Sequence, residues 1–397
     1  MHKIERLLQT LAPKGVEFRK LGEVCEILDN RRIPIAKNKR NPGIYPYYGA
    51  NGIQDYIDSY IFDGDFVLVG EDGSVINKDN TPVVNWASGK IWVNNHAHVL
   101  QTKNELKLKF LYFYLQTIDV SYCVAGTPPK INQENLKKIT IPIPPLEIQQ
   151  EIVKILDAFT ELNTELNTEL KVRKKQYEYY QNMLLDFNGI NQNHKDAKMS
   201  AKTYPKRLQT LLQTLAPKGV EFRKLGEVCD FQKGKSITKK AVTFGKVPVI
   251  SGGRQPAYYH NEANRSGETI AISSSGVYAG YVSYWDIPVF LADSFSVSPK
   301  QKTLMPKYLF HYLTTQQDVI HATKSTGGIP HVYSKDLQNF LIPIPPLEIQ
   351  QEIVKILDQF SILTTDLLAG IPAEIEARKK QYEYYREKLL TFKPLKA

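Results

Sequence analysis

The sequence IPIPPLEIQQEIVKILD occupies residues 141–157 and occurs again, unchanged, at residues 342–358. Two more runs are repeated in the same order: LLQTLAPKGVEFRKLGEVC at residues 7–25 and 211–229, and RKKQYEYY at residues 173–180 and 378–385. Internal self-similarity at a fixed interval indicates an architecture built from repeated units. The three blocks therefore divide the 397-residue chain into two halves of the same design.

Between the identical blocks the two halves differ. Residues 26–140 and 230–341 have similar lengths but share little sequence. Neutral drift after a duplication would blur every segment alike, whereas here the blocks are unchanged and the segments between them are rewritten. A constant frame that carries two different modules explains this contrast.

Apolar residues recur at steps of four and three after Pro144-Pro145, a pair that ends an extended segment and favours a helix start. Such steps are typical of a coiled-coil seam. In the first half the predicted seam comprises Ile152, Ile155, Phe159, Leu162, Leu166, Leu170, Tyr177 and Tyr180. In the second half it comprises Ile353, Ile356, Phe360, Leu363, Leu367, Tyr382 and Tyr385. Each helix would span about 40 residues, or about 60 Å, and cannot bury such a stripe alone. We expect the two helices to pack antiparallel, because they belong to two-fold related halves of one chain.

The two helices are not identical. The first contains a tandem Thr-Glu-Leu-Asn array over residues 160–170. One four-residue unit adds a net helical rotation of about 40° and about 6 Å of length, close to the rotation of about 35° per DNA base pair. The array is thus a candidate spacer ruler, with replication slippage in a tolerant helix as the alternative. The second helix contains Gly370-Ile371-Pro372, which should break or kink it.

Each module mixes short β-rich runs with Gly and Pro turns, and each should contain one amphipathic helix, near residues 108–118 and 306–316. The predicted fold class is therefore α+β, with two similar globular domains joined by the helix pair. The predicted segments are a first recognition domain at 1–145, a central helix at 146–190, a linker at 191–206, a second recognition domain at 207–346 and a C-terminal helix at 347–397.

Composition favours a polyanionic partner. The chain has a formal net charge of +10, and Lys and Arg side chains placed along a phosphate backbone release condensed counterions. Its three cysteines form no CxxC pair, which argues against a zinc ribbon or a disulfide framework. No run approaches the roughly 20 apolar residues that cross a membrane, and the first residues lack the apolar core of a signal peptide. We expect a cytoplasmic protein with no membrane contact.

Loops of the modules carry the candidate DNA contacts. Basic side chains suit phosphate contacts, while polar and aromatic side chains suit base edges. The first module offers Arg31, Arg32, Lys37, Lys39, Arg40, Asn94, His96 and Lys130. The second module offers Lys233, Lys235, Lys239, Lys240, Arg254, Ser274, Tyr278, His331 and Tyr333. A solvated basic loop or an ordinary turn role is the alternative at each position.

Catalytic signatures are missing from the sequence. The Pro-Pro pairs lie in Thr-Pro-Pro-Lys and Ile-Pro-Pro-Leu contexts, so no Asn/Asp-Pro-Pro-Tyr/Phe run is available to stack a flipped adenine. No His, Cys and carboxylate set has the spacing of a metal site. We expect a chain without catalytic residues, without a metal and without a cofactor of its own.

The combination of twin variable modules, the doubled IPIPPLEIQQEIV helix entry, the tetrapeptide array and the doubled RKKQYEYY resembles the specificity subunit of type I restriction–modification systems. The resemblance covers nearly the whole chain. It implies that each module reads one half of a split, asymmetric sequence in double-stranded DNA, and that an antiparallel coiled coil sets the gap. It also implies two methyltransferase subunits on the repeated frame and restriction subunits with translocase and nuclease activity. Those partners would bring S-adenosylmethionine, ATP and Mg2+.

Three alternatives remain open on the sequence alone. One is a specificity subunit of another multisubunit restriction–modification class, with a single fused nuclease–methylase partner. A second is a coiled-coil scaffold that binds only protein. A third is an enzyme whose catalytic residues follow no known pattern.

Overall fold

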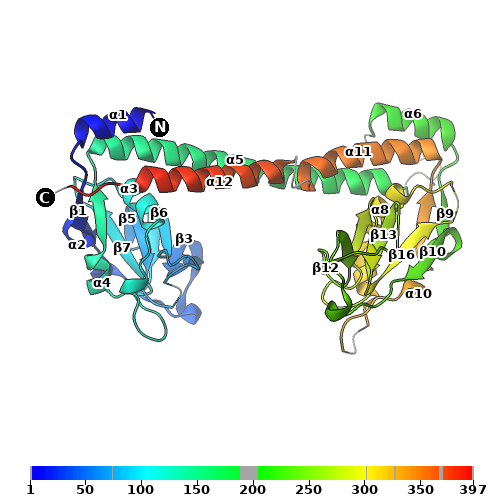
Figure 1. Cartoon of the computed structure of the whole chain (residues 1–397), viewed down its shortest axis with the longest axis horizontal. Coiled ribbons are helices and arrows are strands. Elements are labelled where there is room, and N and C mark those ends of the chain that lie inside the picture. Colours follow the sequence, from blue (N-terminus) through cyan, green and yellow to red (C-terminus); the bar gives the residue numbers. More distant parts are fainter. Residues whose placement is uncertain are drawn as a thin grey trace. The chain divides into compact units, whose positions relative to one another are not determined.

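The computed structural model describes residues 2–73, 75–187, 204–300, 302–325, 328–365 and 370–395. The chain divides into two compact units (Figure 1). Unit 1 comprises Met1–Asn167 and Glu374–Ala397, and unit 2 comprises Thr168–Ala373. The helices predicted as separate connectors are thus shared between the units, because each part of a helix packs on the module beside it. The predicted linker lies outside the described residues from 191 to 203.

Unit 1 consists of a mixed sheet, flanking helices and a two-stranded ribbon. Its helices are α1 (His2–Leu11), α2 (Leu21–Val24), α3 (Leu108–Leu115), α4 (Gln133–Lys138), the first part of α5 (Leu146–Leu185) and most of α12 (Ile371–Leu390), with short 3-10 turns η1 (Asp29–Arg31), η2 (Lys37–Lys39) and η3 (Ser121–Cys123). Its strands are β1 (Glu17–Lys20), β2 (Cys25–Ile27), β3 (Pro42–Gly49), β4 (Gly52–Ile57), β5 (Phe62–Gly70), β6 (Val84–Val93), β7 (Ala97–Thr102) and β8 (Thr140–Ile143). Six strands form one sheet in the order β2-β7-β5-β6-β3-β4. Helix α3, apolar on most of its surface, buries Phe110 and Phe113 in the core beside this sheet.

Unit 2 repeats this plan, with its main strands divided between a four-stranded and a three-stranded sheet. Its helices are α6 (Lys206–Leu215), α7 (Leu225–Val228), α8 (Pro306–Thr315), α9 (Gln317–Ala322), α10 (Ser334–Leu337), α11 (Leu347–Thr365) and the second part of α5, with the 3-10 turn η4 (Lys239–Ala241). Its strands are β9 (Glu221–Lys224), β10 (Cys229–Lys233), β11 (Val247–Ile250), β12 (Tyr258–His260), β13 (Thr269–Ser273), β14 (Val282–Trp285), β15 (Phe290–Leu291), β16 (Ser294–Pro299) and β17 (Leu341–Ile344). The sheet orders are β10-β16-β13-β14 and β12-β11-β15. The α+β class, the internal repeat and both amphipathic helices are as predicted.

The identical blocks form identical structure. Strand β1 pairs antiparallel with β8, and β9 pairs antiparallel with β17 in the same register, so that Phe18 faces Pro142 and Phe222 faces Pro343. The helices that precede these ribbons are tied to the long helices by equivalent ion pairs. Lys3 pairs with Glu151 at 2.5 Å in unit 1, and Arg207 pairs with Glu352 at 3.0 Å in unit 2.

A buried glutamine explains the constant helix entry. Gln149 is fully buried in the first turn of α5. Its side-chain amide donates to the carbonyls of Glu105 at 2.9 Å and Pro144 at 2.7 Å, and its oxygen accepts the backbone N–H of Lys107 at 2.8 Å. These bonds attach the helix to the loop before α3 and satisfy polar groups that are costly to bury without a partner.

The second unit has an equivalent buried glutamine with the same hydrogen bonds. Gln350 is fully buried and donates to the carbonyls of Thr303 at 2.8 Å and Pro345 at 2.7 Å. Its oxygen accepts the backbone N–H of Met305 at 2.8 Å. Substitution of either glutamine would remove the hydrogen bonds that attach the start of one long helix to the loop of its module.

The long helices pack antiparallel within each unit. In unit 1, Phe159 of α5 contacts the rings of Tyr382 and Tyr385 of α12, with centroids 6.2 and 5.6 Å apart. The earlier residue Ile152 of α5 lies in the same core cluster as Leu389, which follows those tyrosines. In unit 2, Phe360 of α11 stacks on Tyr180 of α5 at 5.0 Å.

Two predicted seam residues are wrong, and they are equivalent in the repeat. Leu162 is 41% exposed and Leu363 is 44% exposed, whereas Leu156 and Leu357, which the predicted seam omitted, are fully buried. The buried stripe advances in steps of four over its first turns, so it passes beside Leu162 and Leu363 rather than through them. Leu367 lies outside the described residues.

The second long helix is interrupted where the sequence predicts a break. Helix α11 ends at Thr365 and α12 begins at Ile371, so Gly370-Ile371-Pro372 marks the start of a new helix. Proline at the second position of a helix is tolerated because its missing N–H has no partner in the first turn. The predicted C-terminal helix is therefore two helices, of 19 and 20 residues.

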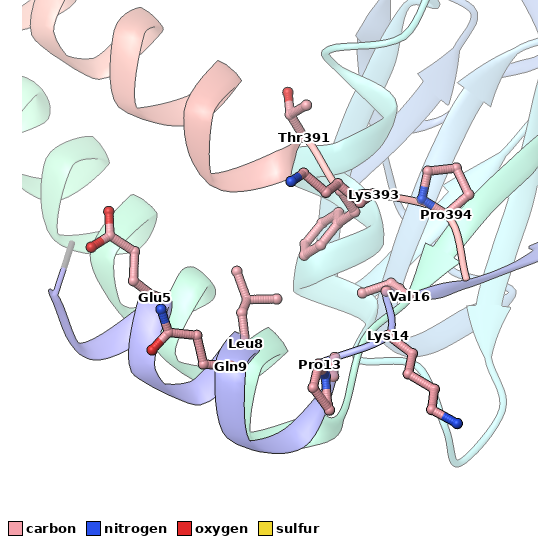
Figure 2. A pocket seen from close by; sticks show the side chains of 12 residues that line it. Glu5, Leu8, Gln9, Pro13, Lys14, Val16, Thr391, Lys393 and Pro394 are labelled. Carbon is pink, nitrogen blue, oxygen red and sulfur yellow. The ribbon is translucent and has the colours of Figure 1, made fainter. Parts of the chain in front are cut away.

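The C-terminal segment returns to the N-terminal block within unit 1. The backbone N–H of Val16 donates to the carbonyl of Lys393 at 2.9 Å, and that of Leu395 donates to the carbonyl of Val16 at 2.9 Å. Figure 2 shows Leu8 of α1 and the C-terminal residues Lys393 and Pro394 around a cavity of about 780 Å3. The residues that line this cavity belong to the frame and not to the module loops. Among the described residues, no helix is both long and apolar enough to span a membrane.

Candidate nucleic-acid interface

The loop that follows β2 presents part of the predicted basic set to solvent. Lys37 and Lys39 are exposed on η2, which ends before Arg40. Arg31 is also exposed, and its guanidinium lies 4.8 Å from the centroid of the Phe62 ring while donating to the carbonyl of Ile61. These three cations are placed where a phosphate could approach them.

Two other arginines of this loop have structural roles, contrary to the prediction. The Arg32 side chain is 11% exposed and forms ion pairs with Glu71 at 2.5 Å and Asp29 at 3.4 Å. The Arg40 side chain is 13% exposed, pairs with Asp55 at 3.4 Å and lies over the ring of Tyr47 at 4.1 Å. Both guanidinium groups are used to hold the loop against the sheet.

Arg32 belongs to a buried network of opposite charges. His98, which is fully buried, lies 2.6 Å from Asp29 through Nδ1 and 2.8 Å from the carbonyl of Ile131 through Nε2. Both ring nitrogens of His98 therefore have an oxygen within hydrogen-bond distance. Lys130 pairs with Glu71 at 3.2 Å on the outer side of the network.

The network also decides the ionisation of Asp29. Burial raises the pKa of this carboxyl, but the hydrogen bond from His98 and the positive charges of His98 and Arg32 outweigh it, so the pKa lies below its usual value. Asp29, Glu71 and His98 bring ligand-type atoms within 4.8 Å of one another. Because cationic side chains already neutralise both carboxylates, their chemistry is that of an ion-pair network and does not fit a metal site.

The remaining candidates of the first module differ in exposure. Asn94 is 3% exposed, its side chain accepts from the backbone of His96 at 2.8 Å, and it donates to Gln54. It is therefore a turn residue and not a surface contact, which corrects the prediction. His96 lies next to it with a half-exposed ring that contacts Asp72, and Lys130 is 47% exposed.

The second module presents its basic candidates more openly. Four lysines are exposed: Lys233 at the end of β10, Lys235 in the loop that follows, and Lys239 and Lys240 on η4. Arg254 is exposed in the loop after β11, and its guanidinium lies 4.9 Å from the centroid of the Tyr278 ring. An arginine stacked on an exposed tyrosine combines a phosphate-binding group with a flat surface that can pack against a base or sugar.

Three further candidates of the second module border one cavity. His331 and Tyr333 have stacked rings with centroids 5.9 Å apart, and Ser274, whose carbonyl accepts the backbone N–H of Val332, lines the same cavity. The cavity has a volume of about 430 Å3, and Lys233 and Lys335 also line it. Asp293, which the sequence analysis did not select, is an exposed member of the lining and accepts a hydrogen bond from the hydroxyl of Ser275. No local motif marks Asp293, because the fold alone brings it to Ser274 and His331.

The cysteines give no sign of nucleophilic chemistry. Cys25, Cys123 and Cys229 are buried, and burial raises the pKa of Cys25 and of Cys229 to about 12. The thiolate is the reactive form of cysteine, so these two thiols remain neutral and unreactive near neutral pH. They act as small apolar residues of the two cores.

Comparison with known families matches both halves of the chain. The model described as the type I restriction modification DNA specificity domain matches residues 13–173 and again residues 217–377. A specificity subunit of a type I restriction enzyme from Haemophilus influenzae is 37% identical over 402 aligned residues, which cover 98% of each chain. The specificity subunit of the type I restriction enzymes EcoR124I and EcoR124II from Escherichia coli is 29% identical, over 99% of this chain and 97% of that one.

A solved structure has the same fold. The crystal structure of the S subunit of a type I restriction–modification system from M. genitalium superposes with a TM-score of 0.69 at 20% sequence identity, covering 95% of this chain and 96% of the other. The two-fold repeat of modules and helices is therefore an architecture already seen in an experimental structure.

Proposed function

Because this chain belongs to the type I restriction–modification DNA specificity family, we propose that it recognises a bipartite, asymmetric DNA sequence, one half with each module. One observation carries the proposal: the frame of the two units is the same in sequence and hydrogen bonding, whereas the side chains on the module loops differ. Two different readers held in equivalent frames select two different half-sites.

The exposed cations are the proposed phosphate contacts. They are Arg31, Lys37, Lys39 and Lys130 in the first module and Lys233, Lys235, Lys239, Lys240 and Arg254 in the second. His96, Ser274, Tyr278, His331 and Tyr333 remain candidates for contacts with bases. Arg32, Arg40 and Asn94 hold the loops in place and contribute to recognition only through that support.

The constant frame is the proposed site for protein partners. Identical surfaces at two places in one chain fit two copies of the same partner, and we propose that these are two methyltransferase subunits. Restriction subunits with translocase and nuclease activity would join them. The relatives named above are specificity subunits of restriction enzymes, which supports this assembly.

The chain itself is proposed to be non-catalytic. Its architecture serves recognition, and all three cysteines are buried thiols with raised pKa values and without nucleophilic character. S-adenosylmethionine, ATP and Mg2+ would act in the partner subunits, and the present residues would position those partners on DNA.

Methylome sequencing tests the proposal. A host lacking other methyltransferases would express the chain together with the methyltransferase subunit of the same system. The expected result is one methylated motif made of two specific half-sites separated by a fixed, unspecific gap. A continuous or palindromic motif would contradict the two-reader arrangement, and methylation that does not require this chain would contradict its role in recognition.

A further inference from the structure

Three loop segments of each module meet in one backbone arrangement, which we call the three-loop junction. It comprises residues 71–73, 95–97 and 129–131 in the first module and residues 274–276, 292–294 and 330–332 in the second. The N–H of Glu71 donates to the carbonyl of His96 at 2.8 Å, and the N–H of Ser274 donates to that of Asp293 at 3.0 Å. The pairing makes position 96 equivalent to position 293.

The other strands of the junction correspond in the same way. The N–H of Ile131 donates to the carbonyl of Glu71 at 2.9 Å, and that of Val332 donates to the carbonyl of Ser274 at 2.9 Å. The first module also has a bond from Gly73 to Pro129 at 3.0 Å. Its counterpart in the second module runs from Gly276 to Pro330, also at 3.0 Å. The two junctions are therefore one scaffold with aligned positions.

At one aligned position the two junctions carry side chains of opposite hydrogen-bonding character, whereas Lys130 and His331, at another aligned position, can both donate. The first junction displays His96 and Lys130, and both can donate. The second displays the carboxylate of Asp293 at the position of His96. A carboxylate accepts hydrogen bonds and cannot donate them. A constant scaffold that carries a donor at this position in one module and an acceptor in the other is suited to select between ligands with different donor and acceptor patterns.

The second junction also has room for a ligand. Asp293 is exposed and lines the 430 Å3 cavity together with His331 and Tyr333. Its contact with the hydroxyl of Ser275 uses one of the roughly four acceptor sites of a carboxylate. Two lysines at the same cavity, Lys233 and Lys335, are placed to hold a phosphate while a base edge reaches the carboxylate.

We infer that Asp293 is a specificity-determining residue, whose carboxylate accepts a hydrogen bond from the exocyclic amino group of adenine or cytosine in one half-site. Only these two bases present an amino donor in the major groove, the N6 of adenine and the N4 of cytosine. Guanine and thymine present acceptors there, which the carboxylate repels. The inference rests on the proposed function and assigns the class of base that this position selects.

The experiment uses the methylome of the complete complex with three single variants. Asp293→Ala removes the acceptor and should make one position of one half-site degenerate. Discrimination at that position should fall by roughly 5- to 150-fold, while the other half-site and the gap stay unchanged. Asp286→Ala, which removes an exposed carboxylate of the same module, is the matched control and should leave the motif intact.

Asp293→Asn distinguishes the two bases. A side-chain amide pairs with adenine through N6 and N7, so a position that wild type reads as adenine should stay adenine, and one read as cytosine should change to adenine. The Asn variant has the shape of the wild type and decides the matter for a cytosine position if the Ala variant fails to fold. For an adenine position Asp293→Leu, which has a similar size and no acceptor, then replaces the Ala variant, and the same loss of discrimination is expected.

The outcomes separate the inference from the proposed function. An unchanged motif in both Asp293 variants, or equal loss at every position of the half-site, would overturn the role of Asp293 while leaving two-module recognition standing. A guanine or thymine at the affected position of the wild-type motif would also overturn it. A wild-type chain without a bipartite motif would instead refute the proposed function.

Discussion

The buried glutamine at the start of α5 offers a quantitative test of the frame. Gln149→Leu keeps the size and burial of the side chain but removes its amide. The change leaves the N–H of Lys107 and the carbonyls of Glu105 and Pro144 without the partner they have in the wild type. We expect a loss of stability confined to unit 1, because all four residues belong to it.

The magnitude follows from these three hydrogen bonds. Leaving a buried polar group unsatisfied costs about 1 to 3 kcal/mol. We take about 1 kcal/mol for each of the three groups, because the apolar leucine side chain restores part of the burial free energy. The free energy of unfolding should therefore fall by about 3 kcal/mol. With a urea dependence of about 2 kcal/mol/M, the midpoint should shift by about 1.5 M.

Tryptophan fluorescence can report on one unit at a time. The chain has three tryptophans, and Trp86 and Trp92 lie in unit 1 while Trp285 lies in unit 2. In a Trp285→Phe background, urea unfolding followed by fluorescence measures unit 1 alone. Gln150→Leu is the matched control, because Gln150 is the exposed neighbour in the same helical turn. Exposed substitutions usually change stability by less than about 0.5 kcal/mol.

A midpoint shift no larger than that of the control would refute the role assigned to Gln149. The mirror experiment sharpens the test: Gln350→Leu should shift the unfolding of unit 2, read from Trp285 with the other two tryptophans replaced. Equal shifts of both units by either substitution would also contradict the reasoning, since the two glutamines bond within separate units.

Three further outcomes are expected. Replacing Lys37 and Lys39 by Ala should weaken DNA binding equally for all sequences. The negative slope of log affinity against log salt should become shallower by about 2, as measured by fluorescence anisotropy of the complex in a salt series. The pKa of Asp29 is lower in the folded chain, so its contribution to the stability of unit 1 is fully present above its unfolded-state pKa of about 4 and is lost as the pH falls toward its folded-state pKa. Urea midpoints measured from pH 7 to 3 should show this decline, and Asp29→Asn should flatten it. Deleting residues 164–167 should shorten the gap of the methylated motif by about one base pair and leave both half-sites unchanged, whereas altered half-sites with a constant gap would contradict the ruler hypothesis.

The frame was predictable because its determinants are local and occur twice. Pro144-Pro145 favours a helix start, and the apolar period predicts the long helix that follows. Which face of the long helix is buried was harder to predict. Steps of four and of three are both compatible with the same stripe, so the sequence alone placed Leu162 in the seam and left out Leu156.

The recognition loops were harder to predict because their polar partners are distant in sequence. A basic run marks Arg31 and Arg32 alike, yet only Arg32 is close to Glu71, 39 residues further along the chain. Asn94 was predicted as a contact at the surface, but it is buried directly after the end of β6. Asp293 has no distinguishing neighbours in the sequence and becomes notable only when the fold brings it to Ser275.

The division of the chain into units has a consequence for its synthesis. Unit 2 is continuous, but unit 1 needs both the first residues and those from Glu374 onward. Its core includes Leu389, Leu390 and Phe392, which leave the ribosome after the roughly 200 residues of unit 2. At about 5 to 20 residues per second, the nascent first module waits on the order of 10 to 40 s for the helix that completes it. Unit 2 is complete at Ala373, before Leu389 has been made, so the second module can complete its fold first, reversing the usual order in which the N-terminal part of a chain matures ahead of the rest.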